Sequence, residues 1–181
     1  MKKRVWIVTM GLATLILFLV TPLFSSENDA TLKIGNAAPH FKDRTLDGKE
    51  LDLAKLHGKL VLVDFWGTWC PSCRTEIPHL KEAYKKFHKD GLEIISISVN
   101  DELNALKAFI KKNAMDWIQV FDQDGKLTDL YHVQYTPSPF LIDHTGKIVA
   151  MDEELMGDDL LPKIEQHLKK LPKQEKEQKK V

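Results

Sequence analysis

The sequence has few cysteines, no excess of charge of either sign and no internal repeat, and the first two of these absences exclude whole classes of protein. Two cysteines in 181 residues are too few for a fold held together by disulfides, and a four-ligand zinc site would need both cysteines and two further ligands. Basic and acidic residues number 26 each, so the chain lacks the basic surplus of a nucleic-acid-binding domain. The positions of the two cysteines therefore carry more information than their number.

The two ends of the chain differ from its middle. Three cations at positions 2–4 precede the apolar run Val5–Phe24, whose length of about 20 residues is enough to cross a bilayer. No small-residue cleavage site follows, so we favour an uncleaved membrane anchor in residues 1–30 over a cleaved signal peptide, with the rest of the chain outside. Residues 171–181 are polar and lysine-rich and predict a disordered tail, which leaves 31–170 as the folded domain.

Apolar runs alternate with helical patterns in this domain. Leu60–Trp66 and Leu92–Val99 are rich in β-branched residues and predict buried strands. Between them, apolar residues recur at helical spacing from Ile77 to Phe87. A strand, a helix and a strand in this order predict a right-handed βαβ unit with parallel strands.

Further elements flank this unit on both sides. A second amphipathic helix is expected from Leu103, with Asn100 or Asp101 as its N-cap. Upstream, the Asp-Gly pair at positions 47–48 lies between short segments and predicts an N-terminal β-hairpin.

The C-terminal part of the domain predicts antiparallel structure. Two short strands, Phe140–Asp143 and Lys147–Met151, are joined by a His-Thr-Gly turn, and a last helix carries apolar residues on one face from Leu160 onward. The expected fold is therefore of the α/β class: a central mixed sheet flanked by helices, with an added N-terminal hairpin.

The two cysteines form the segment Cys70-Pro71-Ser72-Cys73, just after a predicted strand and at the start of a predicted helix. Free backbone N–H groups and the positive end of the helix dipole stabilise a thiolate there, and Pro71 suits the first helical turn. Two intervening residues allow the second sulfur to close a disulfide on the first. We expect Cys70 to be exposed and nucleophilic, and Cys73 to be more buried and to resolve the mixed disulfide.

Two other interpretations of the cysteine pair are a zinc half-site and a purely structural disulfide. The zinc site would need two more ligands, and the seven histidines contain no His-x3-His pair. A structural disulfide within one helical turn would be unusual. We expect no metal and no cofactor.

Several motifs in this order resemble the thioredoxin superfamily and, more narrowly, the membrane-anchored TlpA/ResA-like thiol-disulfide oxidoreductases. The resemblance extends from about Ile34 to Leu168 and implies a thioredoxin-like fold. The motifs that carry it are Trp66-Gly67-Thr68-Trp69-Cys70-Pro71-Ser72-Cys73-Arg74-Thr75-Glu76-Ile77-Pro78, Ala38-Pro39-His40-Phe41, Leu46-Asp47-Gly48-Lys49, Leu56-His57-Gly58-Lys59 and Thr136-Pro137-Ser138-Pro139-Phe140-Leu141-Ile142-Asp143.

The resemblance implies roles for further residues. Pro137 matches the superfamily's cis-proline beside the disulfide, and the backbone of Thr136 would pair with an extended substrate. Glu76 matches the acidic residue of ResA-like proteins, and Asp64 matches the buried aspartate of thioredoxin. Trp69 is expected to shield the disulfide and contact substrate.

The two carboxylates also have a physical interpretation of their own. Asp64 interrupts an apolar strand, and a buried unpaired carboxyl group tends to stay protonated or to exchange its proton with a neighbour. It can therefore accept the proton of Cys73. For Glu76, a solvated glutamate favoured by the helix dipole is an equal alternative.

The expected function is thiol-disulfide exchange outside the cytoplasmic membrane, with reduction of disulfides in exported proteins. Partners implied by the family are exported thiols and disulfides, among them apocytochrome c, and a membrane electron donor. We expect a monomer that binds the membrane through its N-terminal segment and does not bind nucleic acid. One alternative is a thiol peroxidase of the same fold, which needs a threonine three residues before its cysteine, where this chain has Gly67. The other is a Sco-like copper-binding module, which would need three residues between the cysteines, where this chain has two.

Overall fold

The computed structural model describes residues 31–172. The expected anchor at 1–30 and nearly all of the expected tail lie outside the described residues. Within the described range, no helix combines the length and the apolar character that crossing a membrane requires.

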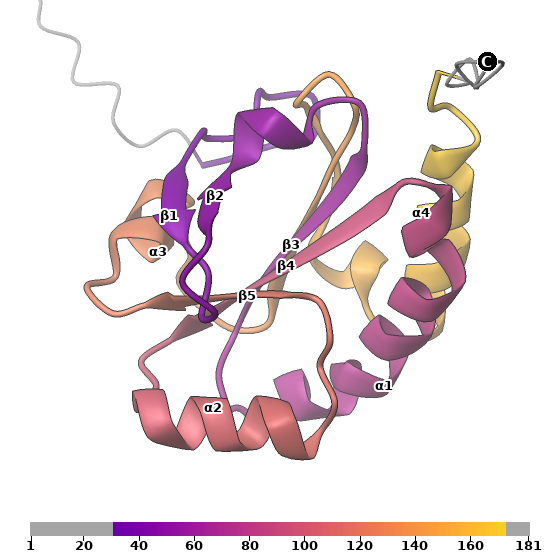
Figure 1. Cartoon of the computed structure of the whole chain (residues 1–181). Helices are drawn as coiled ribbons and strands as arrows, with labels where there is room; N and C mark the ends of the chain where they lie inside the picture. Colours follow the sequence, from indigo (N-terminus) through magenta and orange to yellow (C-terminus); the bar gives the residue numbers. More distant parts are fainter. Residues whose placement is uncertain (1–30, 173–181) are drawn as a thin grey trace, which may run out of the picture. The chain divides into compact units, whose positions relative to one another are not determined.

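A five-stranded mixed sheet forms the centre of the domain, with strand order β5-β4-β3-β6-β7 (Figure 1). Strand β3 pairs in parallel with β4, and β4 with β5, whereas β6 is antiparallel to both β3 and β7. The elements in chain order are β1 (Lys42–Arg44), β2 (Glu50–Asp52), β3 (Leu60–Trp66), α1 (Pro71–Phe87), β4 (Leu92–Val99), α2 (Leu103–Lys112), β5 (Ile118–Asp122), α3 (Lys126–Leu130), β6 (Ser138–Ile142), β7 (Ile148–Met151) and α4 (Leu160–Leu168).

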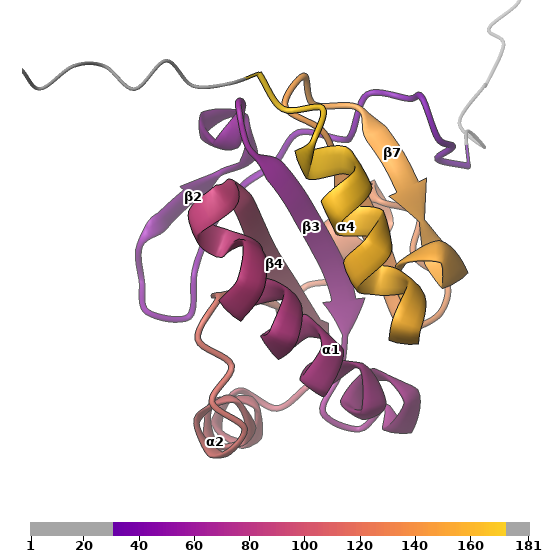
Figure 2. The same ribbon diagram turned by 90° about the vertical axis from the view of Figure 1, so that its right-hand side faces the viewer.

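Helices α1 and α4 cover one face of the sheet, where Figure 2 shows them lying across β3 and β4. Strands β3 and β4 are buried on both faces along their whole length, as their apolar sequences predict. Their side chains on this face pack with α1, with α4 and with Leu106 of α2 into one hydrophobic cluster, which also contains both cysteines. The N-terminal end of α1 is thereby fixed at the carboxyl end of β3.

The opposite face of the sheet is covered by the β1–β2 hairpin region and by the segment that contains α3. Phe41, Leu51 and Leu53 pack there against alternate residues of β3. Tyr131, which follows α3, is buried among Phe41, Phe65 and Phe140, with ring centroids 5.2–6.1 Å away. The two faces thus have separate cores, and the expected N-terminal hairpin is present, with Arg44 opposite Glu50.

The segment before and within the hairpin also contacts both outer strands of the central sheet. Near β7, Ile148 N–H donates to the Asn36 carbonyl (2.9 Å). Near β5, Leu46 N–H donates to the Gln119 carbonyl (2.8 Å). One stretch of about a dozen residues therefore reaches from one edge of the sheet to the other.

Helix α2 begins at Leu103, as expected, but the structure corrects its predicted N-cap. Its N-cap is Glu102, whose carboxylate accepts from the N–H groups of Asn104 and Ala105 (3.0 and 2.8 Å). Asn100 and Asp101 precede the cap, and the Asp101 side chain contacts a different part of the molecule. Strand β6 also begins at Ser138, two residues earlier than predicted.

Candidate active site

The two cysteines form a disulfide at the start of helix α1. Cys70 is the N-cap residue with extended backbone angles, and Cys73 lies in the first turn. The N–H of Cys73 donates to the sulfur of Cys70 at 3.1 Å, which is the capping contact of this helix. The helix terminus therefore supplies a hydrogen-bond donor to one sulfur, as expected from the position of the pair after a buried strand.

The expected difference in exposure between the two cysteines is wrong for this disulfide form, because both are 3% exposed. The loop before β6 covers Cys70: the Thr136 carbonyl oxygen lies 3.7 Å from its sulfur, although it is 66 residues away in sequence. The two cysteines are distinguished by their position on the helix rather than by exposure.

The loop that covers the disulfide contains the expected cis-proline. The Thr136–Pro137 peptide bond is cis, and both residues are half-buried. The Ser138 hydroxyl, which follows the cis bond, donates to the Tyr135 carbonyl, which precedes it (2.6 Å). Strand β6 then pairs with β3, and Pro139 is placed opposite Asp64. The sheet therefore brings the cis-proline loop and the cysteine-bearing helix to the same end of β3.

Asp64 is a buried carboxyl group on β3, with 5% of its surface exposed. Burial, together with the negative charge of Glu76, raises the pKa of Asp64 from 3.8 to about 7, and a hydrogen bond with Ser96 opposes the rise. Ser96 lies opposite Asp64 on β4, and its hydroxyl accepts from the Trp117 indole N–H (2.8 Å). A carboxyl group with such a pKa can both hold and release a proton near neutral pH.

Glu76 is half-buried on α1, and its carboxylate accepts from the Gly157 N–H at 2.7 Å. Gly157 belongs to the turn before α4, so this bond joins the two helices that cover the same face. The carboxylate is therefore held by a backbone donor rather than free in solvent. Its charge is near enough to Asp64 to contribute to the raised pKa of that group.

The two tryptophans near the disulfide have different environments. Trp66 is 1% exposed and packs against Phe109, whereas Trp69 is 53% exposed. The Trp69 indole N–H donates to the Val99 carbonyl (3.0 Å). A Cβ at Gly67 would lie 2.5 Å from the indole nitrogen of Trp69, so glycine allows the ring to lie against the backbone.

Sequence reasoning missed two contacts that hold this site. The bond from Gly157 to Glu76 joins residues 81 apart, and no local pattern indicates it. Asp101 accepts hydrogen bonds from Thr68, which leads into the active-site segment, but its place between a strand and a helix favours a capping role. The sequence offers one indirect signal for Asp101. Two acidic residues, Asp101 and Glu102, precede α2, and the helix needs only one of them as its N-cap.

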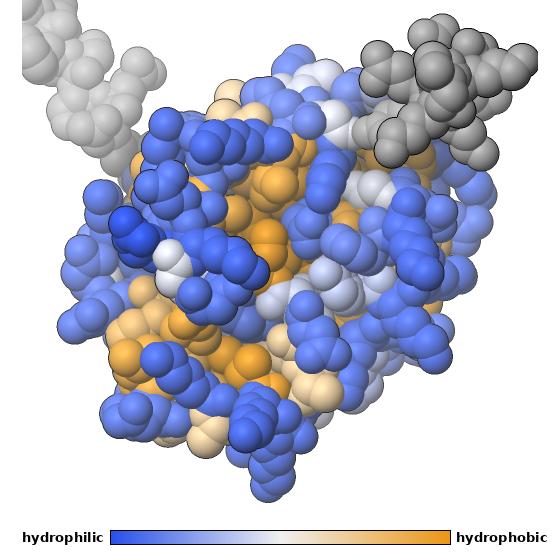
Figure 3. Space-filling model, viewed as in Figure 1, coloured by the Kyte–Doolittle hydropathy of each residue, from blue (hydrophilic) through white to orange (hydrophobic). Residues whose placement is uncertain are grey.

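A cleft of about 650 Å³ lies elsewhere, between the β1–β2 hairpin and the segment from α2 to β5. Its walls include Leu46, Ile110, Met115 and Trp117. Figure 3 shows hydrophobic surface in this hollow with hydrophilic side chains around it. Neither cysteine lines the cleft, so it is separate from the dithiol.

A family model described as the AhpC/TSA family matches residues 34–151. The chain belongs to this family. Among its relatives, the thiol-disulfide oxidoreductase ResA of Bacillus cereus is 35% identical over 148 residues, which cover 82% of this chain and 83% of the relative. ResA of Bacillus subtilis is 32% identical over 162 residues, covering 88% of this chain and 90% of the relative.

Solved structures of proteins described by thiol-disulfide exchange are also similar to this member of the AhpC/TSA family. The thioredoxin domain of a Bacteroides vulgatus thiol-disulfide oxidoreductase has a TM-score of 0.70 and 35% identity, covering 76% of this chain and 99% of that domain. A structure from Chlorobium tepidum, described as a putative thiol:disulfide interchange protein DsbE, has a TM-score of 0.62 and 28% identity, covering 66% and 84%. The thioredoxin-like fold and the TlpA/ResA-like assignment are confirmed, and the protein is a thiol-disulfide oxidoreductase.

Proposed function

We propose that this oxidoreductase works as a reductant of disulfides in exported proteins, on the outer side of the cytoplasmic membrane. In this reaction the Cys70 thiolate attacks a substrate disulfide, and one substrate sulfur leaves as a thiolate. Cys73 gives its proton to Asp64 and attacks the sulfur of Cys70. The second substrate sulfur is released, and the enzyme keeps the disulfide seen in the structure until a membrane donor supplies two electrons.

The observation that carries the direction of transfer is the charge around the dithiol. Glu76 lies on the cysteine-bearing helix, and its negative charge acts on Asp64 of the adjoining strand β3. Negative charge disfavours a nearby thiolate, and a less stabilised reduced form makes a more reducing couple. Arg74 is exposed, where solvent and salt screen its charge. No cation stands between the two cysteines.

A redox titration of the purified domain against dithiothreitol tests the direction. We expect a potential below about −200 mV, in the range of reducing dithiols. A potential near about −120 mV, that of a strong oxidant, would overturn the proposal.

We also propose that residues 1–30 anchor the domain 31–170 to the membrane, with residues 171–181 as an appended tail. The three cations before an apolar run support an N-terminus inside and a domain outside. Cell fractionation tests this point. The full chain should be recovered with membranes; a soluble protein beginning near Glu27 would show a cleaved signal instead.

For the partner, we propose proteins with a reducible cysteine pair, including apocytochrome c with its Cys-x-x-Cys-His thiols. The support is the named function of the relatives, together with the cis-proline loop against Cys70, which presents the backbone of Thr136 beside the attacking sulfur. Cys73→Ser leaves the mixed disulfide unresolved and traps the partner on Cys70. Recovery of apocytochrome c supports this partner, and its absence among the trapped proteins would exclude it.

A further inference from the structure

The segment Gly67–Trp69 connects strand β3 to Cys70 and has no helix or strand pairing of its own. Its position depends on contacts with the segment that leads from β4 to α2. Asp101 makes most of these contacts: its carboxylate accepts from the Thr68 N–H (2.9 Å) and from the Thr68 hydroxyl. The Ser98 hydroxyl donates to the same carboxylate (2.5 Å).

The three donors come from two directions. Ser98 is the penultimate residue of β4 and is 1% exposed, so it fixes the carboxylate to the sheet. Thr68 is two residues before Cys70, the N-cap of α1. The two bonds from Thr68 to Asp101 therefore hold the segment just before Cys70 in a fixed position relative to β4. The neighbouring Trp69 indole donates to the Val99 carbonyl, which adds a second tie to the end of β4.

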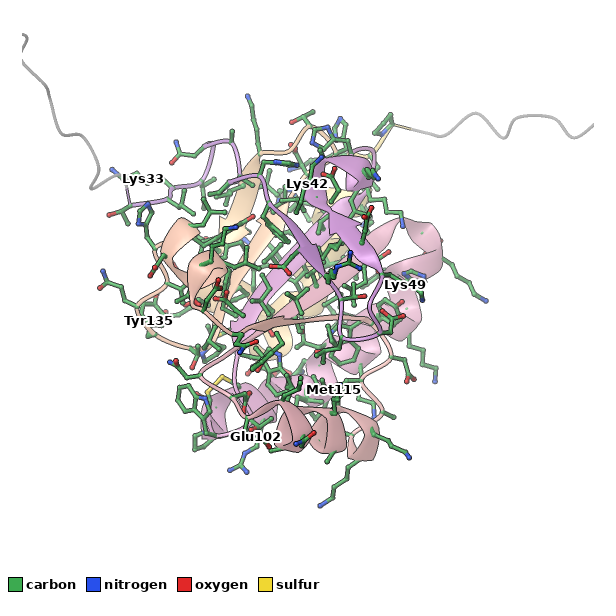
Figure 4. All side chains as sticks on the ribbon, turned by 60° about the vertical axis from the view of Figure 1, so that its left-hand side comes forward. Lys33, Lys42, Lys49, Glu102, Met115 and Tyr135 are labelled. Atoms are coloured by element: carbon green, nitrogen blue, oxygen red, sulfur yellow. A yellow bond between two sulfur atoms is a disulfide. The ribbon has the colours of Figure 1, made fainter. Side chains whose placement is uncertain are left out.

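Asp101 is not required to begin helix α2. The adjacent Glu102, labelled in Figure 4, caps that helix with two hydrogen bonds of its own. The disulfide, drawn in yellow, lies at the same end of the molecule. Two consecutive acidic residues therefore have separate tasks, one on α2 and one on the active-site segment.

We propose that Asp101 is a positioning residue for the dithiol: by holding Thr68 against β4, it keeps Cys70 at the N-terminus of α1. The effect is on the cysteine pair rather than on the whole fold, because the Cys70 sulfur accepts the Cys73 N–H only while it stays over the first turn of α1. This inference rests on the proposed function only in that a reactive Cys70 thiolate is the attacking group.

The test measures the alkylation rate of Cys70 in the reduced protein against pH, and the rate at which a disulfide peptide is reduced. Asp101→Ala releases both Thr68 contacts. We expect the Cys70 alkylation rate at neutral pH to fall about tenfold and the midpoint of the pH profile to move upward, because the charge-assisted hydrogen bond from the Cys73 N–H to the Cys70 thiolate is lost. This loss outweighs the removal of the Asp101 charge, which by itself would move the midpoint downward. Asp101→Asn retains an acceptor for the Thr68 N–H and should restore most of the rate.

Glu102→Ala is the matched control, because it removes a neighbouring carboxylate with two backbone contacts of its own. It is expected to lower the stability of α2 and to leave the Cys70 pH profile unchanged. Three results would overturn the inference: an unchanged profile in Asp101→Ala, an equal shift in Glu102→Ala, or equal impairment in Asp101→Asn and Asp101→Ala.

If Asp101→Ala does not fold, Thr68→Val removes only the hydroxyl contact and should shift the profile in the same direction by less. No shift in that variant would then refute the positioning role. Failure of the proposed function is a separate result, since a wild-type protein that reduces no disulfide peptide would still show whether Asp101 controls the alkylation profile.

Discussion

The substitution Asp64→Asn exchanges a buried carboxyl group for an amide of nearly the same size and shape, and it is expected to stabilise the folded protein increasingly as the pH rises. In the folded state the pKa of Asp64 is about 7, against 3.8 for the ordinary group. The folded protein thus binds more protons than the unfolded chain between these two values. Its stability therefore decreases with rising pH over that interval, and the decrease is complete above the folded pKa.

The magnitude follows from the difference in pKa. A difference of about three, at 1.36 kcal/mol for each pKa unit, corresponds to about 4 kcal/mol in the free energy of unfolding. The amide that replaces the carboxyl group does not titrate. The stability of the variant minus that of the wild type should therefore rise by ~4 kcal/mol between pH 4 and pH 8, with most of the rise below pH 7.

The assay is urea denaturation of the oxidised protein across this pH range, so that neither thiol titrates. Asp129→Asn is the control, because it makes the same change from carboxyl group to amide at an exposed position on α3. A difference between wild type and Asp64→Asn that stays flat from pH 4 to pH 8 would refute the assignment of Asp64 as a proton-holding group.

Three further predictions concern the dithiol and its surroundings. Limited alkylation of the reduced protein should label Cys70 before Cys73, because Cys70 is at the helix terminus; peptide mass spectrometry showing the reverse order would exchange their roles. Glu76→Gln should lower the pKa of Asp64, since it removes a negative charge that raises it, and the pH dependence of urea denaturation should shift accordingly; an unchanged dependence would contradict the coupling. Gly67→Ala should displace the Trp69 indole and lower the free energy of unfolding by about 1 kcal/mol through the lost hydrogen bond to Val99, and an unaltered urea midpoint would argue against that contact.

Much of the fold follows from local sequence patterns. Leu60–Trp66 and Leu92–Val99 are continuous apolar runs, and the structure has β3 and β4 with those bounds. The cysteine pair follows a predicted strand and precedes a predicted helix, and the structure places it at the start of α1. The cis state of the Thr136–Pro137 bond follows only from the family resemblance, since no local pattern distinguishes it from a trans bond.

Two of the errors share one physical cause, which is contact between segments distant in sequence. The usual division of roles in a C-x-x-C pair predicts an exposed Cys70, but a loop 66 residues away in sequence covers it. Asp101 is a plausible cap for α2 because aspartate is a good cap residue, but Glu102 takes that place and leaves Asp101 to bind Thr68. Local propensity gives each residue's options, and tertiary packing selects among them.

The stretch that precedes β2 has a consequence for solubility. Strands β5 and β7 are the two edges of the central sheet, and an open edge can pair with another chain. Contacts at Asn36 and Leu46 occupy part of both edges, while Phe41 between them covers apolar surface on one face. A shortened chain that begins at β3 would lose all three protections together. Such a chain is expected to self-associate into aggregates even where its dithiol and helices are intact.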